Sequence, residues 1–131
     1  QWVNLGAITT TSNLKNTYSS VDLVTENGKI DSKQLFLGSI IGDHVKTSIG
    51  TTLNTGTTIG FGSCLYGTGL HAKYIPPFSW GGPNDYAAFE LQKFFEVQQN
   101  VMKRRQVELS DDEKALITQL YSTLYSKNQK K

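Results

Sequence analysis

A six-residue repeat runs through the middle of this chain and constrains its fold more than any other feature. Five large aliphatic residues and one threonine recur at every sixth position: Leu35, Ile41, Thr47, Leu53, Ile59 and Leu65. A small or β-branched residue follows four positions after each of them: Ser39, Val45, Thr51, Thr57, Ser63 and Gly69. Neither the two-residue alternation of a strand nor the 3.6-residue period of a helix gives this spacing. A period of six is typical of hexapeptide repeats, which coil short parallel strands into a β-helix.

Each hexapeptide is expected to supply one short strand and one corner, and three of them one triangular turn. The aliphatic residue points inward and stacks on its counterparts in the adjacent turns, while the small residue points inward near a corner. Thr47 breaks the aliphatic pattern, so its hydroxyl needs an internal hydrogen-bond partner. Gly42 and Gly60 directly follow inward aliphatic residues, where the absence of a Cβ is expected to relieve strain at a tight corner. The sequence therefore predicts a mainly β fold, with the repeat spanning residues 1–74.

A polar loop is expected to interrupt this repeat at about residues 10–33. Val21, Leu23 and Ile30 form a short apolar alternation around the turn-forming sequence Glu-Asn-Gly-Lys at 26–29, which predicts two strands joined by that turn. Long loops on a rigid scaffold often carry binding residues. The loop is thus a place to look for a site.

The pattern changes after the repeat. Residues 75–85 contain all three prolines of the chain and are expected to form an extended connector, because proline disfavours both helices and central strands. Residues 86–131 are expected to form a helical hairpin that caps the open end of the coil. Its first helix is predicted from about Tyr86 to Arg105. Its second helix begins with a capping box, Ser-Asp-Asp-Glu at 110–113.

Composition limits the classes of partner. The chain has 131 residues and a net charge of +2, which gives no broad electrostatic basis for binding nucleic acid or a membrane surface. No apolar run approaches the roughly 18 residues that cross a bilayer. The one cysteine, Cys64, suits a reducing compartment, so a cytoplasmic location is expected. The first residues already follow the repeat, with Leu5 before Gly6 and Thr9 at the small position, which indicates the C-terminal part of a longer protein.

The sequence contains no nucleophile–base pair, phosphate-binding loop or metal-ligand spacing, so it predicts neither a catalytic residue nor a metal site within the chain. The two histidines, His44 and His71, are interpreted as solvated surface side chains, since two residues so far apart do not make a zinc site. Cys64 is interpreted as a surface or interface thiol.

Two motifs carry a family resemblance. Residues 3–16, Val-Asn-Leu-Gly-Ala-Ile-Thr-Thr-Thr-Ser-Asn-Leu-Lys-Asn, resemble the segment Asn-Ile-Gly-Ala-Gly-Thr-x-Thr-x-Asn-Tyr of bifunctional glucosamine-1-phosphate acetyltransferase/N-acetylglucosamine-1-phosphate uridyltransferases. Residues 40–45, Ile-Ile-Gly-Asp-His-Val, resemble their Ile-Ile-Gly-Asp-Asp-Val segment. The whole chain, with Ile-Pro-Pro-Phe-Ser-Trp-Gly-Gly at 75–82, is most similar to variant sugar nucleotidyltransferases of Bacteroidetes-type bacteria.

The resemblance implies a left-handed parallel β-helix that forms a homotrimer with sites between subunits. It implies acetyl-CoA as co-substrate and an amino-sugar phosphate as acceptor, with Mg²⁺ used only by a nucleotidyltransferase domain upstream of this chain. The family's amino-sugar contact matches Asn4, and its acetyl-CoA contacts match Ala7, Asn13 and Leu14. Leu14 replaces a tyrosine of the family, and Ile49 falls near a coenzyme-contacting serine. Lys15 is the candidate for the loop lysine that holds the sugar phosphate.

The same resemblance places the general-base histidine one turn before Asn4, upstream of Gln1. Acetyl transfer to an amine requires such a base, because an ammonium group has no lone pair with which to attack the thioester. Two function classes remain open. One is an acyltransferase domain, and the other is a non-catalytic β-helix that trimerises and regulates a sugar-phosphate nucleotidyltransferase. A structural or ice-binding surface is a distant third, since the outward threonines form no regular column.

Overall fold

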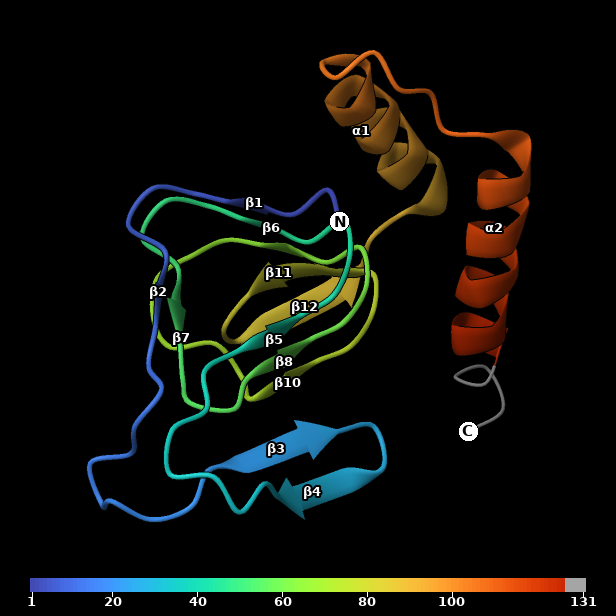
Figure 1. The fold of residues 1–131 in the computed structure, drawn as a ribbon. Helices are drawn as coiled ribbons and strands as arrows, with labels where there is room; N and C mark the ends of the chain where they lie inside the picture. Colours follow the sequence, from blue (N-terminus) through green and yellow to red (C-terminus); the bar gives the residue numbers. More distant parts are fainter. Residues whose placement is uncertain (127–131) are drawn as a thin grey trace. The chain divides into compact units, whose positions relative to one another are not determined.

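The computed structural model describes residues 1–126, and its residues 1–89 contain three stacks of short parallel strands (Figure 1). Stack 1 contains β1 (Asn4–Leu5), β6 (Lys46–Thr47), β9 (Cys64–Leu65) and β11 (Ser79–Gly82). Stack 2 contains β5 (Ile40–Ile41), β8 (Thr58–Ile59) and β10 (Tyr74–Ile75). Stack 3 contains β2 (Thr10–Thr11) and β7 (Thr52–Leu53), with an isolated bridge from Thr52 to Leu70. The chain visits stacks 2, 1 and 3 in repeating order, and we call the three stacks together the coil.

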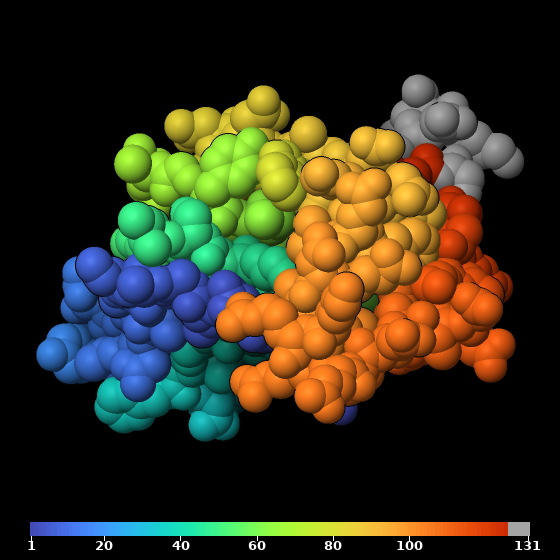
Figure 2. Space-filling model, turned by 90° about the horizontal axis from the view of Figure 1, so that it is seen from above, coloured from blue at the N-terminus to red at the C-terminus, as the bar shows by residue number. Residues whose placement is uncertain are grey.

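The strand register follows the repeat in the sequence. Ile41 pairs with Ile59, and Thr47 pairs with Leu65, so each residue lies beside the one eighteen positions later. Three hexapeptides therefore complete one turn. Figure 2 shows the turns in order, with the N-terminal residues in blue beside the green residues of the next turn and the yellow residues beyond them. The prediction of a mainly β fold is confirmed, with parallel pairing between turns.

The interior of the coil is filled by predicted inward residues, together with Ile75 from the segment predicted to be a connector. Its buried cluster consists of Val45, Leu53, Ile59, Leu65 and Ile75. Thr47 has the internal partners that its hydroxyl requires: its Oγ1 accepts a hydrogen bond from the backbone N–H of Gly6 at 3.0 Å and lies 2.7 Å from Oγ1 of Thr9. The exception to the aliphatic pattern is thus satisfied within the first turns of the coil.

Hydroxyl groups at the small position hold the corners. The side chains of Thr51, Thr57 and Ser63 are fully buried, and each donates a hydrogen bond at 2.9 Å to the backbone carbonyl three residues earlier. A buried carbonyl without a partner is costly. Serine and threonine at this position therefore supply a donor where the corner turns a carbonyl inward.

Gly42 and Gly60 have a different role from the one predicted. Neither has a positive φ, so a strained corner does not require glycine there. Instead, the next turn passes very close: a Cβ at Gly42 would lie 2.8 Å from the backbone nitrogen of Phe61, and one at Gly60 would lie 2.3 Å from that of Pro77. Glycine is needed because adjacent turns of backbone approach each other at these positions.

The prediction that Leu35 points into the coil is wrong. Leu35 is 41% exposed, and Thr11 occupies the expected place beside Leu53. Gly69, predicted to point inward at the other end of the repeat, is exposed as well. Since β2 still belongs to stack 3, the inserted loop comprises residues 12–39, later at both ends than predicted. Leu35 lies on the return path of this loop, outside the repeat.

The predicted hairpin in the inserted loop is confirmed. β3 (Asp22–Thr25) pairs with β4 (Gly28–Asp31) around the turn at residues 26 and 27. The hairpin lies beside stack 2, where the Thr58 hydroxyl donates to the carbonyl of Val24 at 2.8 Å (Figure 1). Gly56 permits this docking, because a Cβ there would lie 2.4 Å from the carbonyl oxygen of Asp22.

The coil continues beyond the predicted limit of residue 74. β10 pairs with β8 and β11 pairs with β9, each sixteen residues after its partner, so this turn is two residues shorter than the others. β12 (Asp85–Ala88) then pairs antiparallel with β11. The connector predicted at 75–85 therefore contains strands. The helix predicted from Tyr86 begins five residues later, because Asp85–Ala88 complete the hairpin.

Two helices form the second part of the chain, α1 (Leu91–Lys103) and α2 (Asp111–Ser126). The capping box is confirmed: Oγ of Ser110 accepts from the Glu113 N–H at 3.2 Å, and Oε2 of Glu113 accepts from the Ser110 N–H at 2.9 Å. Neither helix is long and apolar enough to cross a membrane. That they cap the coil stays a prediction, and residues 127–131 of the predicted two-helix segment lie outside the described residues.

Candidate functional site

Asn4 and Ala7, the first pair of predicted ligand residues, lie on stack 1 and at the corner that follows it. Both are exposed. Asn4 pairs in register with Lys46, and the carbonyl of Ala7 accepts a hydrogen bond from the N–H of Gly50 at 2.8 Å. The backbone of both residues is therefore fixed by the neighbouring turn.

Asn13 and Leu14, the second pair, lie where the chain leaves stack 3 and the inserted loop begins. The carbonyl of Asn13 accepts from the N–H of Leu37 at 2.8 Å, while the residue itself is exposed. Leu14 is half-buried and forms an isolated antiparallel bridge with Phe36. A single chain thus carries its predicted ligand residues at two separate places.

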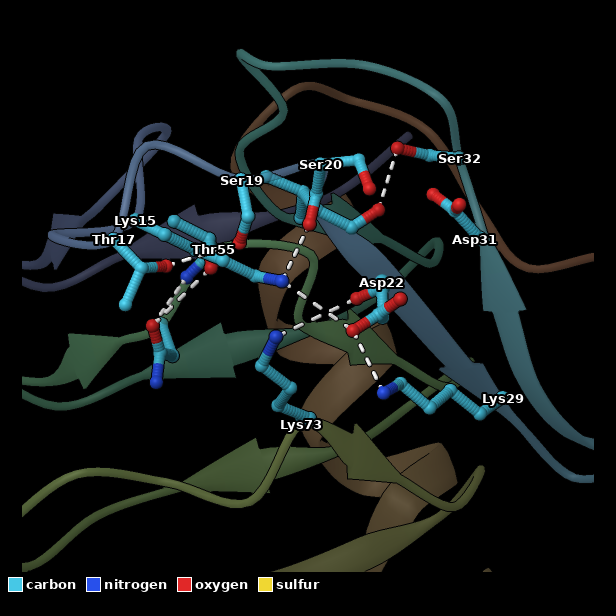
Figure 3. Close-up of polar contacts among 12 residues, drawn as sticks. Lys15, Thr17, Ser19, Ser20, Asp22, Lys29, Asp31, Ser32, Thr55 and Lys73 are labelled. Carbon is cyan, nitrogen blue, oxygen red and sulfur yellow. Dashed lines mark hydrogen bonds and ion pairs between the residues drawn. The ribbon is translucent and has the colours of Figure 1, made fainter.

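Lys15 is drawn into a cluster of charges that sequence reasoning did not anticipate. Its Nζ donates to the carbonyl of Ser20 and lies 3.3 Å from Oδ2 of Asp22 (Figure 3). Nζ of Lys29 lies 2.9 Å from the same carboxylate oxygen. Nζ of Lys73 lies 3.5 Å from the backbone carbonyl of Asp22. We call Lys15, Lys29 and Lys73 around Asp22 the lysine cluster.

Packing between the inserted loop and the coil places these groups. Val21 is fully buried and is held by backbone hydrogen bonds to Ser32 and Gln34. These hydrogen bonds fix the adjacent Asp22, whose backbone carbonyl lies against Gly56. Lys73 comes from the coil itself, since its carbonyl accepts from the N–H of Thr58 in stack 2 at 2.7 Å. The cluster therefore joins an early loop residue, a hairpin and a late turn of the coil.

Charge interactions in the cluster shift the pKa values of its members. The hydrogen bond from Lys29 is the main cause that lowers the pKa of Asp22, and the same bond raises the pKa of Lys29. Burial lowers the pKa of Lys73, and the charges of Lys15 and Lys29 lower it further. Asp31 belongs to a separate pair with Lys33, whose hydrogen bond lowers the Asp31 pKa to about 2. The lysine cluster is thus a cationic group with one anion among its members.

Sequence reasoning missed Asp22, Lys29 and Lys73 as neighbours of Lys15. The residues lie far apart in the chain and belong to no motif. The one signal in the sequence was the hairpin itself. In its register Asp22 pairs with Asp31, and Lys29 lies two residues before Asp31, diagonally across from Asp22. The position of Lys73 depends on the shortened turn between Leu70 and Tyr74, which no pattern in the sequence indicates.

The prediction that the histidines are solvated is wrong for both. His44 is 8% exposed, and its ring stacks edge-on against Phe61 with centroids 5.3 Å apart. His71 is 3% exposed, and its Nδ1 lies 2.6 Å from the hydroxyl of Tyr86, while its Nε2 is buried with no hydrogen-bond partner among the described residues. Cys64 is half-buried, and burial raises its thiol pKa, which disfavours the reactive thiolate.

The buried histidine predicts an acid-sensitive fold. Burial lowers the pKa of His71 below its usual 6.5, so the unfolded chain binds a proton more readily than the folded chain. His71 is therefore expected to leave the free energy of unfolding unchanged above pH 6.5 and to reduce it as the pH drops through that value. Asp22 and Asp31 stay charged in this range because their pKa values lie below 3.8. Urea unfolding between about pH 7.5 and 5.5 measures the loss. If His71→Asn keeps the pH dependence of the wild type, protonation of His71 is not the cause of the acid sensitivity.

The described residues contain no group of three histidine, cysteine or acidic side chains placed to hold a metal ion. Comparison with known proteins adds no family: no protein-family model matches the chain, and no curated protein shows a significant match. The exposed asparagines offer neutral hydrogen bonds, and the lysine cluster offers positive charge for an anion.

Proposed function

We propose that this chain is an acyltransferase domain with a left-handed β-helix, the C-terminal part of a cytoplasmic sugar nucleotidyltransferase. It transfers the acetyl group of acetyl-CoA to the amine of an amino-sugar phosphate such as glucosamine-1-phosphate. The observation that carries the proposal is the parallel coil with an eighteen-residue turn, interrupted by a loop that starts directly after β2. This arrangement agrees with the resemblance in residues 3–16, which also supplies the handedness.

The proposed ligand contacts follow the same residues. The exposed side chain of Asn4 binds the amino sugar, and Ala7, Asn13 and Leu14 bind acetyl-CoA. Since one chain presents these groups at two separate places, a homotrimer with sites between neighbouring copies accounts for both. Lys15 supplies positive charge for the sugar phosphate, although its ammonium group is already bonded to Ser20 and Asp22.

The proposal assigns no general base to residues 1–126. The two histidines of the chain are both buried, and the pKa of His71 is lowered. A histidine upstream of Gln1 would remove the proton from the acceptor amine, as the resemblance implies. Backbone N–H groups would stabilise the oxyanion that forms when the amine attacks the thioester. Mg²⁺ belongs to the upstream nucleotidyltransferase reaction and has no part in this transfer.

Asn4→Ala is expected to weaken binding of glucosamine-1-phosphate roughly tenfold, because it removes a hydrogen-bonding group from the proposed acceptor site. Isothermal titration calorimetry of this chain measures the change without requiring turnover. Asn16→Ala, which alters another exposed asparagine in the inserted loop, is the matched control and is expected to bind like the wild type. Equal affinities for the wild type and Asn4→Ala would reject the assigned role.

A non-catalytic trimerisation domain is the second candidate. Its support is the exposed apolar side chains at the same corner of adjacent turns, Ile8 at 81% and Ile49 at 74% exposure, which suit contact with another copy. Sedimentation equilibrium together with the titrations separates the two candidates. A trimer that binds neither acetyl-CoA nor glucosamine-1-phosphate favours the non-catalytic function.

A further inference from the structure

The lysine cluster holds more positive charge than its internal partner neutralises. Two ammonium groups contact the carboxylate of Asp22, whose side chain is 19% exposed, and a third, from Lys73, contacts the backbone carbonyl of the same residue. Lys15 and Lys29 contact the same carboxylate oxygen, at 3.3 Å and 2.9 Å. The three lysines and Asp22 together carry a net charge of +2.

Lys73 is the member with unused binding capacity. Its Nζ makes one weak contact, at 3.5 Å, with a backbone carbonyl, and it has no ion-pair partner among residues 1–126. The residue is half-buried, and two other ammonium groups lie near it. An ammonium group has three donors, so most of its hydrogen-bonding capacity faces no protein acceptor in this cluster.

The surrounding acids do not cancel this charge. Asp31 is paired with Lys33 at 2.9 Å, and Glu26 lies at the exposed turn of the hairpin. In Figure 3 the side chains of Lys15, Lys29 and Lys73 all point toward Asp22, from three different segments of the chain. A bound anion would relieve the repulsion among them, because several ammonium groups can share the oxygens of one ligand.

We propose that the lysine cluster is a binding site for a phosphate group, with Lys73 and Lys29 as its main donors and Asp22 as an internal competitor. A phosphate dianion matches the net charge of +2 and has enough oxygens to accept from two or three ammonium groups. A single carboxylate carries half that charge and already has an equivalent in Asp22. Lys15 is tied to Ser20 and Asp22, so it contributes charge and holds Asp22 in place.

Only the identity of the molecule that carries the phosphate rests on the proposed function. Both proposed substrates have suitable groups: the sugar phosphate has a monoester, and acetyl-CoA has a pyrophosphate and a 3′-phosphate. The preference for phosphate itself can be tested with inorganic pyrophosphate alone. Failure of the site and failure of the acyltransferase proposal therefore give different results.

The first experiment titrates the full chain with pyrophosphate at low salt, using calorimetry. Lys73→Gln and Lys29→Gln are each expected to weaken binding about tenfold, since each removes a charge-assisted hydrogen bond. Lys33→Gln is the matched control, because Lys33 lies next to the same hairpin but is paired with Asp31. It is expected to change the affinity less than twofold. Absence of pyrophosphate binding, or an equal loss in all three variants, would overturn the proposal.

The second experiment removes the negative charge of the cluster and tests for a gain in affinity. Asp22→Asn removes the competing negative charge, so it is expected to tighten pyrophosphate binding several-fold, whereas a cluster that only anchors the loop would gain nothing. Circular dichroism identifies any variant that fails to fold, and the Lys73→Gln result then decides the case. Unchanged or weaker binding by folded Asp22→Asn contradicts the role of Asp22 as a competitor.

The third experiment identifies the carrier. Glucosamine-1-phosphate is compared with glucosamine, and coenzyme A with its 3′-dephospho form, in the wild type and in Lys73→Gln. The carrier is the compound whose binding depends on both its phosphate and Lys73. Pyrophosphate binding without binding of either substrate would keep the site and reject the acyltransferase function. Binding of both substrates that is insensitive to Lys73 and Lys29 would keep the acyltransferase function and reject the lysine cluster as the site of their phosphate groups.

Discussion

Gly60→Ala is expected to destabilise the coil by about 3 kcal/mol, because the added methyl group overlaps backbone that has no room to move. A Cβ at this position would lie 2.3 Å from the nitrogen and 2.6 Å from the Cα of Pro77 in the next turn. The contact is with main chain, so rotation of a flexible side chain cannot relieve it. The paired strands β8 and β10, which end just before Gly60 and Pro77, would have to separate. Urea unfolding followed by circular dichroism measures the loss.

Gly38→Ala is the matched control for this prediction. Gly38 has no positive φ, and the nearest atom to an added Cβ is Oγ1 of Thr11, at 4.0 Å. Its replacement is expected to change the free energy of unfolding by less than about 0.5 kcal/mol. If both alanine variants have similar stability, close contact between turns does not explain the glycine at position 60.

Ile59→Ala is expected to reduce the free energy of unfolding by about 3 kcal/mol, through lost burial and the cavity that remains. Ile59 is 2% exposed and lies at the centre of stack 2, between Ile41 and Ile75. The turns on both sides of it are fixed by backbone hydrogen bonds, so the interior has little freedom to collapse around the smaller side chain.

The exposed Ile49 provides the comparison, because it carries the same side chain at a corner of the coil and is 74% exposed. Ile49→Ala is expected to change stability by no more than about 0.5 kcal/mol in the monomer. Thermal or urea unfolding at one protein concentration compares the pair. A cost for Ile59→Ala as small as that for Ile49→Ala would mean that the predicted inward column does not support the fold.

Much of the coil was predictable because its information is local and repeated. Most hexapeptides contain one inward aliphatic residue and one small or β-branched corner residue, so the period alone predicts that Ile41 and Ile59 meet in adjacent turns. The same holds for the hairpin turn at residues 26 and 27 and for the capping box at Ser110, where neighbouring residues satisfy each other. Of the residues predicted for ligand contact, Asn4, Ala7 and Asn13 are exposed.

The interruption of the repeat is where sequence reasoning failed. Counting back from Leu53 in steps of six predicts Leu35 in stack 3, but Thr11 occupies that place and Leu35 lies on the loop. A loop inserted at a corner resets the count, because pairing depends on which segment returns to the coil and not on separation along the chain. The shortened turn before β10 shifts the count again after Leu70. His71 precedes this shift, eighteen residues after Leu53, and it is buried beside Tyr86.

The sequence by itself determined the repeating unit, the parallel strands and the two helices, since each depends on contacts that recur at a fixed spacing. Only the tertiary structure decided the lysine cluster. Its members come from residues 15, 22, 29 and 73, and they meet because Val21 is buried against the coil and Gly56 leaves room for Asp22. Such a meeting depends on one packing contact between distant segments, and no periodic pattern encodes it.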